Sequence, residues 1–224
     1  MLPISAVMFD LDGTLLDTIA DLAAAVNQML AHLGRPPLPV QTVRTFVGKG
    51  IKVLVERALA ATSEHNDDGL LDRILPFYND CYAAANGERT TIYPGVIDGL
   101  DAFRAAGLPL ACVTNKSERF TLPLLERTGL APYFSLVVAG DTLARKKPDP
   151  LPLLHACDQF GIVPTRMLMI GDSANDAVAA RAAGCPVFCV PYGYSEGLNV
   201  RELDVDAIVP TLAAAARLVQ KAPS

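Results

Sequence analysis

The stretch "VMFDLDGTLLDT" (Val7 to Thr18) places two aspartates, Asp10 and Asp12, directly after an apolar run. That run, "ISAVMF" at residues 4–9, predicts a buried strand, because strands covered on both faces of a parallel sheet are continuously apolar. Both carboxylates then follow the carboxyl end of this strand. Open α/β sheets bind ligands outside the carboxyl ends of their strands. The stretch therefore predicts a parallel sheet with a polar site at the end of its first strand.

Four more apolar runs follow in the second half of the chain and alternate with helical patterns. Alternation on this spacing is typical of βαβ units and a parallel sheet. We therefore expect an α/β fold with a Rossmann-like parallel-sheet core. The four runs are "LPLACVTN" (108–115), "FSLVVAGD" (134–141), "RMLMIGDS" (166–173) and "CPVFCVPYG" (185–193).

The segment between the first strand and the later ones has a helical pattern from about Leu15 to Asn86, with no convincing strand. Such an insertion indicates a second, smaller domain. We expect a helical cap domain at residues 16–86 and a discontinuous core at residues 1–15 and 87–224. Turns are predicted at "GRPPLP" (34–39) and "SEHNDDG" (63–69), a return linker at "ANGERTTIYPG" (85–95), and a terminal helix at "TLAAAARLVQKA" (211–222).

Composition excludes several other classes of protein. The 224 residues are 51% hydrophobic and 19% charged, and their net charge of −5 comes without the basic run that nucleic-acid binding would require. No apolar stretch approaches the roughly 20 residues that span a bilayer, and no secretory signal is recognised, so we expect a cytoplasmic protein with no membrane partner. Five cysteines without a CxxC pair and three scattered histidines support neither a disulfide framework nor a zinc site. We expect a monomer or a homodimer.

Further aspartates follow a later strand in the same predicted sheet. Asp172 comes directly after the run "MLMIG", and Asp176 lies one helical turn beyond it. With Asp10 and Asp12, four carboxylates would converge, and like charges that close raise one another's pKa. A bound cation resolves this conflict, and a ligand set of hard oxygens favours Mg²⁺ over zinc. Taken singly, each aspartate could instead be a helix cap or turn residue; the two motifs together favour the metal site.

Four motifs in the right order resemble those of the haloacid dehalogenase superfamily. The helical insertion directly after the first motif resembles the first type of cap domain in that superfamily. The resemblance implies a hydrolase with a small phosphorylated substrate and a magnesium ion. The motifs are "FDLDGTLLDT" (9–18), "VTN" (113–115), "KKPDP" (146–150) and "GDSANDAVAARAAG" (171–184).

The resemblance also implies roles for the first two motifs. Asp10 matches the nucleophile that forms an aspartyl-phosphate, and Asp12 matches the general acid/base. Thr114, the backbone amide of Asn115 and the amides of the turn at Asp12 and Gly13 would hold the phosphoryl oxygens. Dehalogenases that attack carbon are not expected to carry an acid/base at the position of Asp12, so phosphoryl transfer is favoured.

The resemblance of the third and fourth motifs implies roles for the remaining charged residues of the site. Lys147 matches the lysine of the third motif and is preferred over Lys146 because it directly precedes Pro148; the alternative is a solvated surface pair. The implied metal ligands are Asp172, Asp10 and the backbone carbonyl of Asp12. Asp176 would support the site through Lys147 or a metal-bound water.

Substrate specificity is expected to come from the cap, where Gly48, Lys49 and Gly50 precede a predicted helix. Backbone amides, a helix N-terminus and an ammonium suit a small anion such as a carboxylate. The spacing fits neither a P-loop nor a GxGxxG fingerprint. The alternative is a flexible turn with a solvated lysine.

Three stretches resemble bacterial phosphoglycolate phosphatases: "FVGKGIKVLVERALA" (46–60), "YPGV" (93–96) and "YGYSEG" (192–197). The resemblance implies Mg²⁺-dependent hydrolysis of 2-phosphoglycolate to glycolate and phosphate through an aspartyl-phosphate. The alternatives are the same chemistry on a sugar phosphate or pyrophosphate, a phosphomutase, and a binding module without turnover.

Overall fold

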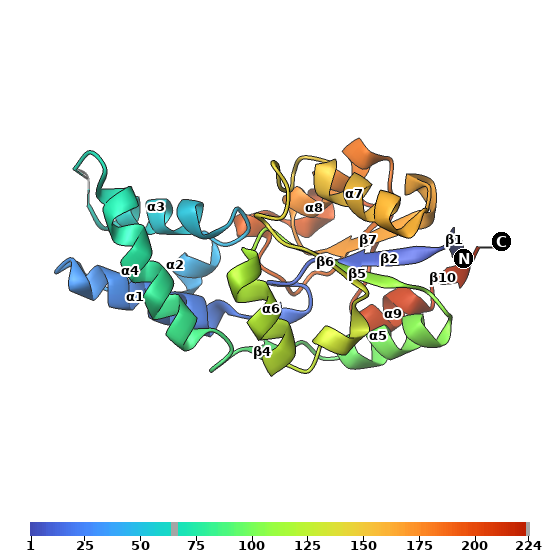
Figure 1. The fold of residues 1–224 in the computed structure, drawn as a ribbon, viewed down its shortest axis with the longest axis horizontal. Coiled ribbons are helices and arrows are strands. Elements are labelled where there is room, and N and C mark those ends of the chain that lie inside the picture. Colours follow the sequence, from blue (N-terminus) through green and yellow to red (C-terminus); the bar gives the residue numbers. More distant parts are fainter. Residues whose placement is uncertain (64–66, 223–224) are drawn as a thin grey trace.

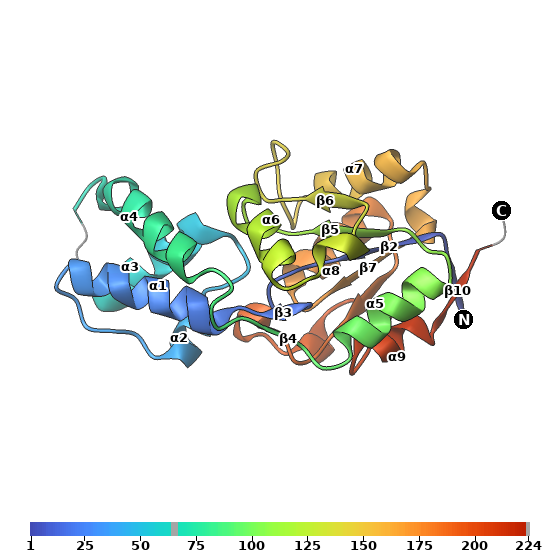
Figure 2. The ribbon, with the colours of Figure 1, turned by 60° about the horizontal axis from the view of Figure 1, so that its bottom comes forward.

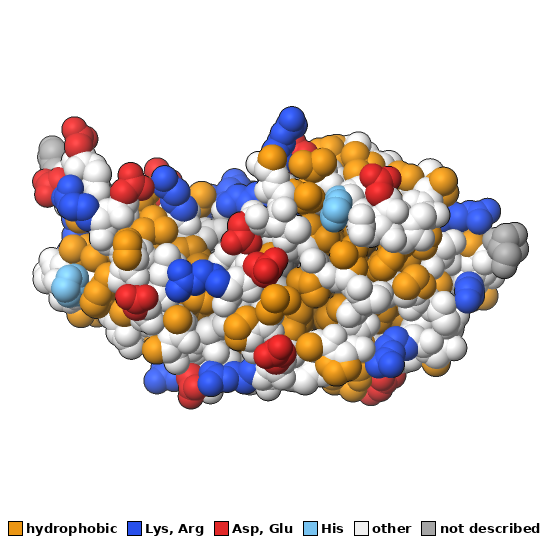
Figure 3. Space-filling view, viewed as in Figure 1, with side chains coloured by type: hydrophobic (Ala, Val, Ile, Leu, Met, Phe, Trp, Pro, Cys, Tyr) orange, Lys and Arg blue, Asp and Glu red, His pale blue; other side chains and the backbone are white. Residues whose placement is uncertain are grey.

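The computed structural model describes residues 1–63 and 67–222, so the expected turn at 63–69 lies partly outside the described residues. The chain forms two lobes, a helical one and a larger one built around a sheet (Figures 1 and 2). None of the helices in the two described ranges is long and apolar enough to cross a membrane. Acidic and basic side chains are interspersed on the face drawn in Figure 3, as the sequence without a basic run predicts.

The larger lobe contains a parallel six-stranded sheet in the order β6-β5-β2-β7-β8-β9. The strand that precedes the two aspartates, β2, lies between β5 and β7 near the middle of the sheet. The expected α/β fold with a Rossmann-like core is confirmed. The strands are β2 (Ala6–Phe9), β5 (Leu110–Val113), β6 (Leu136–Val138), β7 (Met167–Gly171), β8 (Val187–Cys189) and β9 (Ala207–Ile208).

Helices cover both faces of the sheet, with α5 and α9 on one face and α7 and α8 on the other (Figure 1). Along β2 the side chains alternate between these layers: Val7 and Phe9 pack with α5 and α9, whereas Ala6 and Met8 pack with α7 and α8. Burial on both faces explains the continuous apolar runs. The helices are α5 (Val96–Ala105), α6 (Glu118–Arg127), α7 (Leu151–Phe160), α8 (Ala174–Ala183) and α9 (Leu212–Ala216), with short 3₁₀ turns at Ala131–Tyr133, Pro164–Arg166, Ser195–Gly197 and Val200–Glu202.

The helical lobe has an apolar core of its own, formed by α1, α2, α3 and α4. Phe120 of α6 and Tyr194 of the loop after β8 also belong to this cluster, so both lobes share apolar contacts. Two short strands, β3 and β4, pair antiparallel where the chain leaves the core and where it returns. The elements are α1 (Ile19–His32), α2 (Val40–Arg44), α3 (Ile51–Thr62), α4 (Leu70–Ala85), β3 (Leu16–Asp17) and β4 (Thr91–Ile92).

The terminal helix expected at residues 211–222 is wrong in its second half. Helix α9 ends at Ala216, and the chain continues as strand β10 (Val219–Lys221), which pairs in parallel with β1 (Leu2–Ile4). The Leu2 amide donates to the Leu218 carbonyl at 2.9 Å. Residues 219–221 therefore form their backbone hydrogen bonds with β1 instead of continuing the helix, and a local sequence pattern cannot predict this distant pairing. It lies at the end of the molecule farthest from the helical lobe (Figure 1).

Candidate active site

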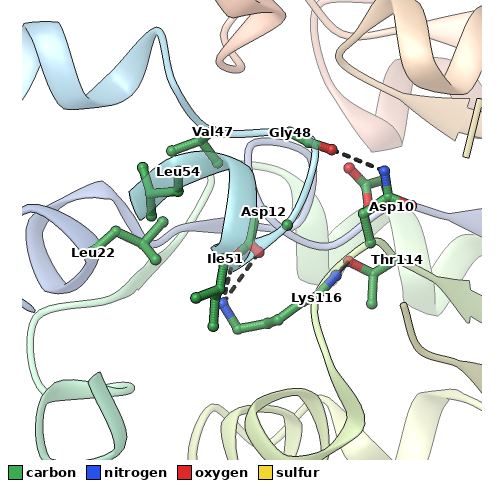
Figure 4. A pocket seen from close by; sticks show the side chains of 11 residues that line it. Asp10, Asp12, Leu22, Val47, Gly48, Ile51, Leu54, Thr114 and Lys116 are labelled. Carbon is green, nitrogen blue, oxygen red and sulfur yellow. Dashed lines mark hydrogen bonds and ion pairs between the residues drawn. The ribbon is translucent and has the colours of Figure 1, made fainter. Parts of the chain in front are cut away.

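The carboxyl ends of three neighbouring strands bring the predicted polar residues together. Asp10 follows β2, Thr114 follows β5 and Asp172 follows β7, and β5 and β7 flank β2 directly. A pocket opens at this edge and is closed from the other side by the helical lobe (Figure 4). The core lines it with Asp10, Asp12, Thr114, Asn115 and Lys116, and the helical lobe lines it with Leu22, Val47, Gly48, Gly50, Ile51 and Leu54.

Lys147 lies buried behind the first aspartate. Its Nζ is 2.9 Å from Oδ1 of Asp10 and 2.6 Å from Oδ1 of Asp176, and it donates to the carbonyl of Val113 at 2.6 Å. Lys146 points elsewhere and donates to the carbonyl of Lys49 at 2.8 Å. The structure thus brings Lys147, and not its neighbour, to the carboxylate cluster.

The two aspartates after β7 are held by different donors. Asp172 accepts hydrogen bonds from the Thr14 hydroxyl at 3.0 Å and from the Tyr194 amide at 2.6 Å. Asp176 accepts from the Ser173 hydroxyl at 2.7 Å through Oδ2, in a reciprocal cap at the start of α8, while its Oδ1 accepts from Lys147. Both oxygens of Asp176 are therefore engaged, which suits a supporting position.

The carboxylate cluster fits a divalent cation. Oxygens of Asp10, Asp172 and Asp176 lie within 4.8 Å of one another. Burial, together with the charges of Asp10 and Asp176, raises the pKa of Asp172 to about 8; burial also raises the pKa of Asp10 to about 6, although Lys147 acts in the opposite direction. Burial alone would lower the pKa of Lys147, but the two neighbouring carboxylates raise it above its usual value. The single ammonium leaves negative charge uncompensated, and an oxygen-only donor set suits Mg²⁺.

Thr114 and Asn115 connect the pocket to its surroundings. The Thr114 hydroxyl accepts a hydrogen bond from the Lys116 amide at 3.2 Å. The Asn115 side-chain nitrogen donates to the carbonyl of Gly48 at 2.9 Å and to that of Lys147 at 2.8 Å. Asn115 therefore ties the cap loop to two loops of the core, a role for its side chain that the sequence did not suggest.

The cap glycines reach the pocket, whereas the side chain of Lys49 does not. Gly48 and Gly50 are among the residues that line it, and Gly50, at φ 84°, precedes the first turn of α3. The Nζ of Lys49 instead lies 3.5 Å from a carboxylate oxygen of Glu196. Glu196 also accepts a hydrogen bond from Arg57 at 2.8 Å. The Lys49 ammonium, which the sequence predicts to bind the substrate, is thus paired with a carboxylate of the core.

The prediction from sequence missed Lys116, which is only 5% exposed. Its Nζ lies 3.1 Å from each oxygen of Asp12, and it also donates to the hydroxyl of Tyr82 on α4. The Thr18 hydroxyl donates to the same aspartate at 2.7 Å. Figure 4 shows the lysine and Asp12 pointing toward each other. A lysine directly after the motif "VTN" was the available signal.

The sequence also did not indicate the contacts between the lobes. Arg44 of α2 donates to the carbonyls of Tyr192 at 2.8 Å and Gly193 at 2.7 Å, and its guanidinium lies over the Tyr194 ring. These partners are almost 150 positions apart in the chain. No local pattern could have paired them.

The backbone of Gly193 lies so close to Asp172 that this position has no room for a side chain. A Cβ added at Gly193 would lie 2.2 Å from the Cβ and from Oδ2 of Asp172. We therefore expect Gly193→Ala to displace Asp172, to lower the free energy of unfolding by about 1–3 kcal/mol and to lower activity at least tenfold. Gly197→Ala in the same loop is not a matched control because its φ is positive. Gly99→Ala is a suitable comparison: it clashes with α9 far from the site and should reduce stability with little loss of kcat.

These features define a class of enzyme, and sequence comparison agrees. A model of the haloacid dehalogenase-like hydrolase family matches residues 7–190, and the chain belongs to this family. It is a hydrolase, as its motifs predicted.

Particular relatives are similar over nearly their whole length. A phosphoglycolate phosphatase of Nitrosospira multiformis is 58% identical over 221 residues, which are 98% of this chain and 97% of that protein. One of Thiobacillus denitrificans is 53% identical, covering 99% of this chain and 98% of that protein. A crystal structure described as a predicted phosphoglycolate phosphatase from Haemophilus somnus superposes with a TM-score of 0.93 at 31% identity, covering 97% of this chain and 99% of that one.

Proposed function

We propose that this protein is a Mg²⁺-dependent phosphatase that hydrolyses 2-phosphoglycolate to glycolate and phosphate. The observation that carries the proposal is the pair Asp10 and Asp12 at the end of a central strand, each beside its own buried lysine, in a pocket closed by the helical lobe. The names and high identity of the relatives support the choice of substrate.

In the first half-reaction, a carboxylate oxygen of Asp10 attacks phosphorus, and the bond from phosphorus to the glycolate oxygen breaks. Asp12 donates a proton to that leaving oxygen. Lys147, 2.9 Å from Asp10, orients the nucleophile and offsets the charge that gathers on the phosphoryl group. The products are glycolate and an aspartyl-phosphate at position 10.

In the second half-reaction, water attacks the phosphorus of the aspartyl-phosphate. Asp12, now a carboxylate, accepts a proton from that water, and the bond to the Asp10 oxygen breaks. Phosphate leaves, and both aspartates return to their starting protonation states. The Thr114 hydroxyl and the backbone amides after β5 and β2 are the proposed donors to the phosphoryl oxygens in both steps.

Asp10, Asp172 and the backbone of Asp12 are the proposed ligands of the magnesium ion, with Asp176 in support. When bound, the ion compensates the carboxylates and stabilises negative charge on the phosphoryl oxygens. The cluster of three carboxylates, the raised pKa of Asp172 and the oxygen-only donor set support this assignment.

The helical lobe is proposed to close over the substrate and exclude water. The bond from Asn115 to Gly48 and the ion pair between Arg57 and Glu196 join the lobes beside the pocket. Leu22 and Leu54 give the pocket an apolar wall on the side of the helical lobe, to the left of the aspartates in Figure 4. A dry site strengthens the electrostatic interactions within it.

The expected cytoplasmic location and the monomeric or homodimeric state stay predictions.

The proposal is tested by measuring phosphate release from 2-phosphoglycolate, sugar phosphates and pyrophosphate, each with Mg²⁺ and with EDTA. We expect activity to be lost in EDTA and kcat/KM to be about 100-fold higher for 2-phosphoglycolate than for the other esters, a difference of roughly 2.7 kcal/mol in transition-state binding. Equal rates on all substrates, still dependent on Mg²⁺, would retain the phosphatase and refute the named substrate.

A further inference from the structure

A cation near the reacting atoms would stabilise a substrate carboxylate, and most cations of this region do not line the pocket. Lys147 is enclosed by Asp10, Asp176 and the Val113 carbonyl. Lys49 and Arg57 both contact Glu196. None of these three side chains is among the described residues that line the pocket.

Lys116 is different, because it is the only lysine or arginine among the described residues that line the pocket. Its ammonium is buried and lies 3.1 Å from both oxygens of Asp12. The surrounding walls are apolar: Leu22, Ile51 and Leu54 face it from the helical lobe (Figure 4). An ammonium in such surroundings attracts an anion far more strongly than one in water does.

We propose that Lys116 binds the carboxylate of the substrate, an inference that rests on the proposed function. The chemistry of the substrate supports this position. One carbon separates the ester oxygen of 2-phosphoglycolate from its carboxyl carbon, so ester and carboxylate oxygens lie only about 3 Å apart. The ester oxygen must lie within hydrogen-bond reach of Asp12 to be protonated. A carboxylate that close to the ester oxygen falls within reach of the cation that contacts Asp12.

The helical lobe completes this carboxylate site. Helix α3 begins at Ile51 directly after Gly50, no side chain caps its N-terminus, and both residues line the pocket. Its first backbone amides add partial positive charge on the side of the pocket opposite the core. Tyr82 of α4 holds Lys116 through its hydroxyl and through its ring, whose centre is 4.7 Å from Nζ. Since α3 and Tyr82 both belong to the helical lobe, the proposed carboxylate site is complete only when that lobe packs against the core.

An alternative role, in which Lys116 only orients Asp12 and does not contact the substrate carboxylate, predicts a different result. The test compares kcat/KM for 2-phosphoglycolate with kcat/KM for 2-hydroxyethyl phosphate, which carries an uncharged hydroxymethyl group in place of the carboxylate. If Lys116 binds the carboxylate, Lys116→Met should lower the first value about 100-fold more than the second. If it only orients Asp12, both values should fall by the same factor.

Lys49→Met is the matched control, because it makes the same change in a lysine of the cap loop and removes the pairing with Glu196. We expect it to leave the ratio of the two kcat/KM values unchanged. The proposal would be overturned if the ratio of kcat/KM for 2-phosphoglycolate to kcat/KM for 2-hydroxyethyl phosphate fell in Lys49→Met but kept its wild-type value in Lys116→Met. If Lys116→Met does not fold, Lys116→Gln, which keeps a donor for Asp12, supports the same comparison.

The same data separate this inference from the proposed function. Equal wild-type values for the two substrates would overturn the proposed function and the role of Lys116 with it. A wild-type preference for 2-phosphoglycolate that survives in the Lys116 variants would overturn the role of Lys116 alone. A preference lost only in those variants is the expected outcome.

Discussion

Asp10→Asn is expected to reduce phosphate release from 2-phosphoglycolate by at least about 10⁴-fold, because an amide oxygen cannot serve as the nucleophile. The substitution keeps the size of the side chain at the end of β2 and leaves Lys147 its partner Asp176. The loss should therefore appear in kcat rather than in folding. The measurement is steady-state phosphate release with Mg²⁺ in excess.

Stability measurements distinguish this loss from misfolding. The pKa of Asp10 is raised from 3.8 to about 6 by burial, so the free energy of unfolding of the metal-free protein falls as the pH rises between these two values, and the loss is complete above about pH 6. Asp10→Asn should therefore melt at a higher temperature than the wild type at pH 8, with a smaller difference at pH 5. Asp141→Asn, at an exposed position beyond β6, is the matched control and should retain activity. An Asp10→Asn variant with normal turnover would refute the assigned nucleophile.

Lys147→Met is expected to lower the free energy of unfolding by about 3–5 kcal/mol, because it leaves buried carboxylates without their ammonium. Asp10 at 2.9 Å and Asp176 at 2.6 Å both lose this partner. Activity should fall by about 10³-fold or more, since the nucleophile loses both its orientation and its counter-charge. Denaturant unfolding and phosphate release measure the two effects.

Lys146→Met provides the control for this prediction, since the two lysines are adjacent in the chain and face different partners. Lys146 is partly buried and donates to the Lys49 carbonyl. We expect its loss to cost less than about 1 kcal/mol and to change kcat only a few-fold. A larger loss of kcat in Lys146→Met than in Lys147→Met would reverse the assignment.

The strands and the aspartates could be predicted because their signals are local. An apolar run followed by a carboxylate identifies the end of a strand, and parallel strands bring such ends to one edge. Asp10 and Asp172 were predicted in this way, whereas Thr114 was indicated by the resemblance to a known motif. The helical insertion was found from a period of 3.6 that persists through α1, α3 and α4.

Interactions between distant parts of the chain account for one wrong prediction and for the unexpected position of the Lys49 ammonium. The segment after Ala216 has a helical composition but forms β10, because β1 offers it an open strand edge. Lys49 has the right neighbours for an anion reader, yet its ammonium lies against Glu196, almost 150 positions further along the chain. In each case a partner from elsewhere in the fold outweighs the local pattern.

The sequence by itself determined the class of fold, the order of the two lobes and the aspartates at the strand ends, because these follow from hydrophobic period and from residues adjacent to a strand. The sequence also favoured Lys147 over Lys146, but only the tertiary structure placed Lys116 beside Asp12 and Lys49 beside Glu196. Lys147, Lys146, Lys116 and Lys49 are four lysines of similar local character, but they reach four different environments. Lys147 and Lys116 pair with carboxylates, Lys49 with Glu196 and Lys146 with a backbone carbonyl, and these partners are set by how distant parts of the chain pack together.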